Sequence, residues 1–143
     1  MPAKKQHNGS ADEVKIAFYD AISRGDLDGL MALWAEDEEI VCIHPNAGRL
    51  IGHADIRASW EFIFENGNMQ LHTRQLHVIR NLLTAVHSVI EEFQAKDSIA
   101  QDVHIIATNV YVKTPRGWRI AMHHASVAAG PAPLDLSKAS VLH

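Results

Sequence analysis

The sequence contains a single cysteine, Cys42, and only 6% of its 143 residues are aromatic. One cysteine excludes an internal disulfide framework and suits a reducing compartment, so we expect a cytoplasmic protein. No apolar run approaches the roughly 18 residues that a membrane-spanning helix needs. The 13 basic residues are outnumbered by 17 acidic ones, which excludes the basic excess typical of nucleic-acid-binding proteins. We therefore expect neither a membrane nor a nucleic acid as partner.

Histidine is abundant, with ten copies in the chain. Protonation of all ten would change the formal net charge from −4 to +6, so surface electrostatics should depend strongly on pH between roughly 7 and 5. The apolar fraction of 47% is ordinary for a globular domain and sufficient for one core. We expect a flexible N-terminus over residues 1–9, one domain over residues 10–128 and a C-terminal tail over residues 129–143.

Three helices are predicted in the first half of the chain. Ser10 and Glu13 form a capping-box pattern, and Gly25 ends the apolar periodicity that follows. Asp26 is placed to cap a second helix, and a third follows Gly52. The residues that recur at helical spacing are Val14, Ala17, Phe18, Ala21, Ile22, Leu27, Leu30, Met31, Trp34, Ile56, Trp60, Ile63 and Phe64.

Strands dominate the second half. A short strand is predicted over residues 40–43, and longer ones over residues 69–81, 83–95, 102–112 and 118–128, which are rich in Val, Ile, Thr and Tyr. The segment 75–93 also permits a helical interpretation. Short connections between the long strands indicate an antiparallel meander, and helices followed by strands indicate an α+β fold.

Several segments carry a resemblance to a known family. The stretch RGDLDGLMALWAED over residues 24–37 resembles the helix-turn-helix of the nuclear transport factor 2-like superfamily, which includes ketosteroid isomerases and SnoaL-like cyclases. The segments ATNVY over residues 107–111 and HHAS over residues 123–126 are similar to the SnoaL-like branch. The resemblance implies a cone in which three N-terminal helices pack in the concave face of a strongly curved, mostly antiparallel sheet. It also implies a pocket in the mouth of the cone and a homodimer formed through the outer sheet face.

Strand alternation gives an expected inner face. If Val112 opposes Trp118 across a five-residue turn, the even-numbered residues of the last two strands point inward and bring His124 close to Thr108. The odd-numbered face would then form the dimer contact through the small apolar residues Ile105, Ala107, Ala121 and Ala125. In strand 83–95 the resemblance favours the face that carries His87 and Glu91.

The candidate catalytic residues are His44 and His124, because an imidazole titrates near neutral pH and can serve as acid or base. The candidate ligand-binding residues are Trp34, Cys42, Trp60, His87, Glu91, Thr108, Met122 and Ser126. Neutral imidazoles in an apolar cone favour a small, hydrophobic, oxygenated ligand. Cys42 as a nucleophile, or His44, His87, Glu91 and His124 as joint metal ligands, are weaker alternatives, and no metal or cofactor is expected.

Three classes of function stay open. The first is a small-molecule-binding domain. The second is an enzyme of the cyclase, isomerase or dehydratase type that acts on a hydrophobic carbonyl compound through His44 or His124. The third is a purely structural dimerisation module. Steroid isomerisation is disfavoured, because its carboxylate base, tyrosine and protonated acid fall on Cys42 or His44, on Phe18 beside Tyr19, and on Thr108.

Overall fold

The computed structural model describes residues 9–67, 69–93 and 103–133. The expected N-terminal segment 1–9 and the end of the expected tail, 134–143, therefore lie outside the described residues apart from Gly9. Within the described residues, three helices and five of the six strands follow the predicted order, whereas the short strand Arg49–Ile51 was not predicted from the sequence. The helices are α1 (Ala11–Arg24), α2 (Leu27–Met31) and α3 (His53–Glu65), and the strands are β1 (Val41–Ile43), β2 (Arg49–Ile51), β3 (Leu71–Arg80), β4 (Thr84–Phe93), β5 (Val103–Thr114) and β6 (Gly117–Ala129).

The helix boundaries have local causes. The Ser10 hydroxyl accepts the Glu13 amide at 3.1 Å and caps α1. Gly25 ends the helix with φ of 65°, a left-handed conformation that glycine adopts without strain. The Asp26 carboxylate then accepts the Gly29 amide at 3.0 Å and starts α2. The capping pattern read from the sequence therefore positions α1 and α2.

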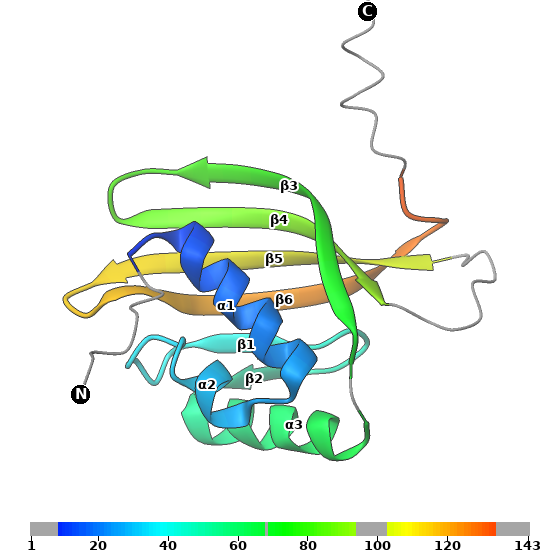
Figure 1. The fold of residues 1–143 in the computed structure, drawn as a ribbon, viewed down its shortest axis with the longest axis horizontal. Helices are drawn as coiled ribbons and strands as arrows, with labels where there is room; N and C mark the ends of the chain where they lie inside the picture. The colour runs from blue at the N-terminus through cyan, green and yellow to red at the C-terminus, as the bar shows by residue number, and fades with distance from the viewer. Residues whose placement is uncertain (1–8, 68, 94–102, 134–143) are drawn as a thin grey trace, which may run out of the picture.

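The six strands form one sheet in the order β2-β1-β6-β5-β4-β3. All neighbouring pairs are antiparallel except β1 and β6, which are parallel. Figure 1 shows α1 crossing one face of this curved sheet, with α2 and α3 beside β1 and β2. The predicted α+β cone, with its helices in the concave face of a mostly antiparallel sheet, is confirmed.

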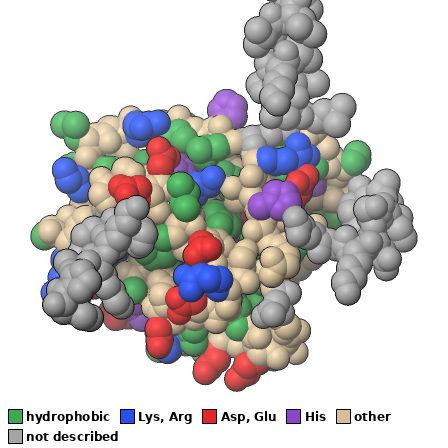
Figure 2. All heavy atoms as spheres, in the orientation of Figure 1, with side chains coloured by type: hydrophobic (Ala, Val, Ile, Leu, Met, Phe, Trp, Pro, Cys, Tyr) green, Lys and Arg blue, Asp and Glu red, His purple; other side chains and the backbone are tan. Residues whose placement is uncertain are grey.

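The core lies between the helices and the concave face of the sheet. Phe18 is fully buried at its centre, and its ring contacts those of Trp34, Trp60 and His123 edge-on. The Ser23 hydroxyl donates to the Leu71 carbonyl at 3.2 Å and ties the end of α1 to β3. Outside the core, Figure 2 shows acidic and basic side chains interspersed on the helical face.

The inner face of β5 differs from the expected one. Ala107, Asn109 and Tyr111 are buried, so the odd-numbered residues point inward and Thr108 points outward. The loop between β5 and β6 has only two residues, and Lys113 therefore pairs with Trp118. Because side chains alternate along a strand, the shift of one residue from the assumed partner Val112 reverses the face of β5.

Strand β6 changes face part-way along its length. Ile120 pairs with Tyr111 and is buried, as expected, but Val110 already pairs with Met122, so Ala121 is the extra residue of a β-bulge. From Met122 onward the alternation is reversed. Met122, His124 and Ser126 lie on the outer face, whereas His123 and Ala125 are buried inside. The prediction that Met122, His124 and Ser126 point inward is therefore wrong.

The same reversal corrects the expected dimer contact. Ala107 is fully buried and Ala125 is 2% exposed, and both lie on the concave face against the helices. Neither is therefore available on the outer surface for contact with a second copy. The outer face is formed instead by rows such as Val86, Val110 and Met122, which lie opposite one another on β4, β5 and β6.

Candidate functional site

A chain of buried hydrogen bonds connects three strands and α1 inside the cone. The distance from His123 Nδ1 to Asn109 Oδ1 is 2.6 Å, from Asn109 Nδ2 to the Tyr19 hydroxyl 2.9 Å, and from that hydroxyl to Glu91 Oε2 2.8 Å. The three bonds have one direction: His123 donates to Asn109, Asn109 donates to Tyr19, and Tyr19 donates to Glu91. The carboxyl group of Glu91 is therefore the final acceptor of the chain.

Burial controls the ionisation of this chain. It raises the pKa of Glu91 to about 7, although the hydrogen bond from Tyr19 opposes the change. Burial and then the charge of Glu91 raise the pKa of Tyr19, so its hydroxyl keeps the proton that it donates. Burial, followed by nearby His44 and His124, lowers the pKa of His123 to about 3 and keeps the imidazole neutral. Glu91 is thus the member of the chain that changes protonation near neutral pH.

A second polar group lies at the end of β1. His44 Nε2 is 2.9 Å from the Ser59 hydroxyl on α3 and 3.7 Å from the Cys42 sulfur. The His44 ring packs edge-on against Trp60 at 4.8 Å. Burial lowers the pKa of His44 and raises that of the Cys42 thiol to about 12. The thiolate that a nucleophile requires is therefore strongly disfavoured at Cys42.

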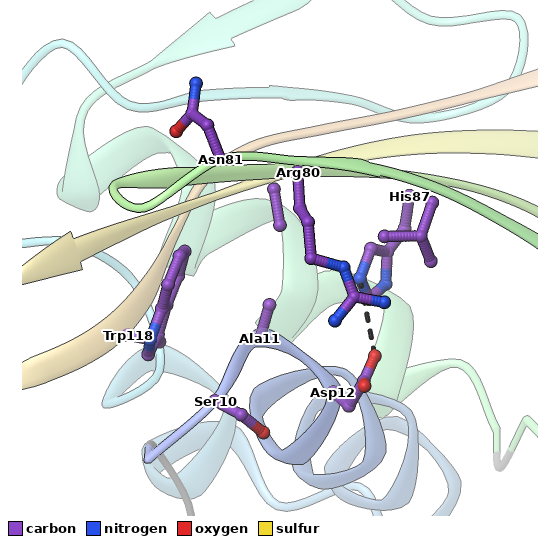
Figure 3. Close-up of a pocket in the computed structure, with 9 residues that line it drawn as sticks. Ser10, Ala11, Asp12, Arg80, Asn81, His87 and Trp118 are labelled. Atoms are coloured by element: carbon purple, nitrogen blue, oxygen red, sulfur yellow. Dashed lines mark ion pairs between the residues drawn. The ribbon is translucent and has the colours of Figure 1, made fainter.

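A cavity of about 100 Å³ lies at the other end of the interior, beside the first turn of α1. Figure 3 shows Arg80 and His87 pointing from the sheet toward this turn, where Asp12 points back at them. Trp118 of β6 closes one side of the cavity. His87 and Glu91 share the inner face of β4, with Val89 between them.

The structure brings only some of the predicted site residues together. Cys42, His44 and Trp60 lie close to one another, and Trp60 is 6.0 Å from the His123 ring. His87 and Glu91 face inward as expected, and Trp34 is buried beside Phe18. Four other predicted site residues lie on the outer face instead: Thr108, Met122, His124 and Ser126.

His44 and His124 therefore do not share an interior cavity. His123, the adjacent residue, takes the interior position because the bulge at Ala121 reverses the alternation before it. Sequence reasoning also missed Asn109, through the misjudged turn, and Tyr19, which stands next to the expected aromatic position Phe18. A two-residue turn at Pro115–Arg116 was the available signal for Asn109, whereas nothing in the sequence marks the bulge.

The four residues considered as joint metal ligands do not converge. His124 is on the outer face, and His44, His87 and Glu91 belong to separate groups inside. In residues 9–67, 69–93 and 103–133, no three His, Cys, Asp or Glu side chains are arranged to hold a metal ion. Over the same residues, no helix has the length and apolar character needed to cross a membrane.

Comparison with known proteins identifies the family. Residues 12–130 match the family model of the SnoaL-like domain. A protein from Thiobacillus denitrificans, provisionally named a calcium/calmodulin-dependent protein kinase type II association domain, shares 35% identity and a TM-score of 0.78. That match covers 90% of this chain and all of the other. No match was found among curated proteins.

Two further solved structures extend the comparison. A protein of the NTF2-like family from Streptomyces avermitilis, provisionally named a dehydratase, shares 29% identity with a TM-score of 0.69 and covers 85% of this chain and 92% of its own. A ketosteroid isomerase-like protein from Erwinia carotovora atroseptica shares 17% identity with a TM-score of 0.62, covers 82% of this chain and 93% of its own, and indicates a common fold alone. The superfamily inferred from residues 24–37 is confirmed.

Proposed function

Because the chain belongs to the SnoaL-like domain family, we propose that it binds a small, largely apolar molecule that carries a neutral oxygen function. The oxygen is held by Glu91, and the apolar body packs against the adjoining interior. The observation that carries the proposal is the one-directional chain of hydrogen bonds that ends on the buried carboxyl of Glu91.

Glu91 has the properties that a neutral oxygen ligand requires. Its pKa of about 7 means that protonated and ionised forms coexist near neutral pH. The protonated carboxyl donates to a carbonyl oxygen, and the ionised form accepts from a hydroxyl. Glu91 is only 6% exposed, so the proposal requires neighbouring side chains to move when the ligand enters. A ligand with a full negative charge would be repelled by the ionised form.

A thermal-shift screen of apolar ketones and alcohols tests the proposal, since a ligand at 100 times its dissociation constant should add about 2.7 kcal/mol of stability. For any hit, we expect Glu91→Met, which removes both carboxyl oxygens at similar side-chain length, and Tyr19→Phe to weaken binding about tenfold, as loss of one strong hydrogen bond would. His124→Gln is the matched control, because His124 lies on the outer face. If the Glu91 and Tyr19 variants bind the hit as tightly as the wild type, or if only the His124 variant loses affinity, this site is refuted.

Acid–base catalysis is the second candidate function, and the same carboxyl favours it. An ionised Glu91 would take a proton from the carbon beside a carbonyl and return it to a departing β-hydroxyl, which leaves as water. This elimination balances without a cofactor. The similarity to the Streptomyces protein named as a dehydratase supports the reaction class. Appearance of the conjugated enone absorbance from β-hydroxy ketones, abolished in Glu91→Gln, is the expected result, and no turnover would leave binding alone.

Homodimerisation through the outer sheet face is also proposed, with a corrected set of contacts. The row Val86, Val110 and Met122 is apolar and half-buried, and it runs across three neighbouring strands. A second copy would cover this row. Sedimentation equilibrium should show a dimer at tens of micromolar that Met122→Asp dissociates, and a wild-type monomer would contradict the proposal.

The structural-module alternative has its own support. Trp34 and Trp60 are each 2% exposed and pack around Phe18, so that part of the interior is filled by side chains. A dimer that binds no compound in the screen, and whose unfolding is unaffected by ligands, would favour this alternative over both small-molecule functions.

A further inference from the structure

The cavity beside the first turn of α1 contains a histidine whose hydrogen-bonding capacity is unused. His87 is fully buried, and neither Nδ1 nor Nε2 has a hydrogen-bond partner in the described part of the chain. The nearest opposite charge is Asp12 Oδ1, 3.6 Å from Nε2, which is beyond ordinary hydrogen-bond range. A buried polar group without a partner costs stability. A ligand that supplies the partner would recover that free energy.

The charges around His87 come from two elements. Asp12 on α1 favours its protonation, whereas Lys15 on α1 and Arg80 on β3 oppose it. Burial is the largest influence and lowers the pKa of His87, which keeps the ring neutral. A neutral imidazole offers one N–H donor and one acceptor. In Figure 3 the Arg80 guanidinium lies on the same side of the cavity as His87. The two His87 nitrogens are themselves buried, so a ligand that binds them must turn the ring toward the cavity.

Part of the remaining lining is apolar. Trp118, Val78 and Ala85 line the cavity together with the polar residues Ser10 and Asn81. Val78 pairs with His87, and Ala85 with Arg80, between β3 and β4. The cavity volume of about 100 Å³ is smaller than the roughly 150 Å³ cavity that accommodates benzene. The occupant must therefore be compact, with one polar end and a short apolar part.

We propose that this cavity binds a small aliphatic carboxylate, between acetate and butyrate in size. The carboxylate accepts hydrogen bonds from Arg80 and from the N–H of His87, and the alkyl part packs on Trp118. Asp12 faces the same space and repels the ligand, which limits the affinity. The site is separate from Glu91 and does not rest on the function proposed above.

Sodium propionate and propionamide form a matched pair of probes, since they have the same shape but differ in charge. Both are titrated into the full chain at fixed ionic strength. The readouts are NMR shifts of the Trp118 indole N–H, assigned with Trp118→Phe, and of the His87 ring nitrogens. We expect propionate to shift both signals and to bind about tenfold more tightly than propionamide.

Three variants locate the site. Arg80 is exposed, so Arg80→Gln should fold normally and weaken propionate binding about tenfold. Asp12→Asn removes the repulsion and should tighten it about threefold. Arg49→Gln is the control, because Arg49 is an exposed arginine on β2 at the opposite edge of the sheet. Equal binding of the two probes, no response of Trp118 and His87 at tens of millimolar propionate, or an equal loss in Arg49→Gln would overturn the proposal.

Discussion

Replacement of Glu91 by Gln should change how the stability of the protein depends on pH. The carboxyl titrates at about 7 in the folded protein and near its ordinary value of 4.5 in the unfolded chain. Between these two pH values the folded protein keeps a proton that the unfolded chain has lost. The free energy of unfolding therefore falls as pH rises through this window, and the loss is complete above the folded pKa. The separation of the two pKa values corresponds to about 3 kcal/mol.

Glutamine has the same shape, and its carbonyl oxygen can accept the Tyr19 hydroxyl, but it does not titrate. The difference in unfolding free energy between Glu91→Gln and wild type should thus move by about 2.5 kcal/mol in favour of the variant from pH 5 to pH 8, because part of the loss has already occurred at pH 5. Subtraction of the two curves removes the contributions of the histidines, which are common to both proteins. If the amide group changes stability by an amount that does not depend on pH, the difference in unfolding free energy shifts by that amount at every pH, and its dependence on pH is unchanged.

Urea unfolding followed by tryptophan fluorescence at matched ionic strength measures this difference. Glu61→Gln, which removes an exposed carboxylate from α3, is the control for the loss of one carboxylate. A difference for Glu91→Gln that does not change with pH would refute the reasoning. It would mean that Glu91 is ionised normally in the folded protein and is not available as a proton donor near neutral pH.

Three further changes test the core and the caps. Trp60→Ala should cost about 3–5 kcal/mol by urea unfolding, because the side chain is 2% exposed, and a loss below about 1 kcal/mol would place it outside the core. Below about pH 6.5 the unfolded chain protonates His123, whereas the buried ring, with a pKa of about 3, stays neutral, so the wild type loses stability as pH falls. In His123→Gln the free energy of unfolding should therefore fall less steeply below about pH 6.5, and the same slope as wild type would contradict this. Gly25→Ala should lower the unfolding free energy by about 1–2 kcal/mol, since φ is 65°, and an unchanged denaturation midpoint would count against the left-handed cap.

The elements could be predicted because their signals are local. Ser10, Gly25 and Asp26 each act through a backbone group within four residues, so the sequence alone positions α1 and α2. The short turn at Pro115–Arg116 likewise indicates the β5–β6 hairpin. The cone followed from the resemblance of residues 24–37, since the curvature of a sheet has no comparable local signal.

The faces of the strands could not be predicted in the same way. Side chains alternate between the two faces of a strand, so the face of each depends on whether an odd or even number of residues separates it from a known position. One extra residue therefore reverses every side chain beyond it. Ala121 carries no mark of the bulge, because alanine is also common in regular strands. The roles of Tyr19 and Asn109 could not be predicted for a related reason. Both depend on Glu91, which is 72 residues from Tyr19 in the sequence.

The hydrogen-bond chain itself explains why β6 holds this register rather than the regular one. Without the bulge, His124 would occupy the interior position and His123 the outer face. If β5 shifted with it, Asn109 would also leave the interior, and the Tyr19 hydroxyl would lose its donor. Each buried polar group left without a partner costs about 1–3 kcal/mol. The bulge at Ala121 forfeits little by comparison, since it leaves one residue out of the β5 register. The same contacts that make Glu91 a candidate site therefore also favour the one strand register in which that site exists.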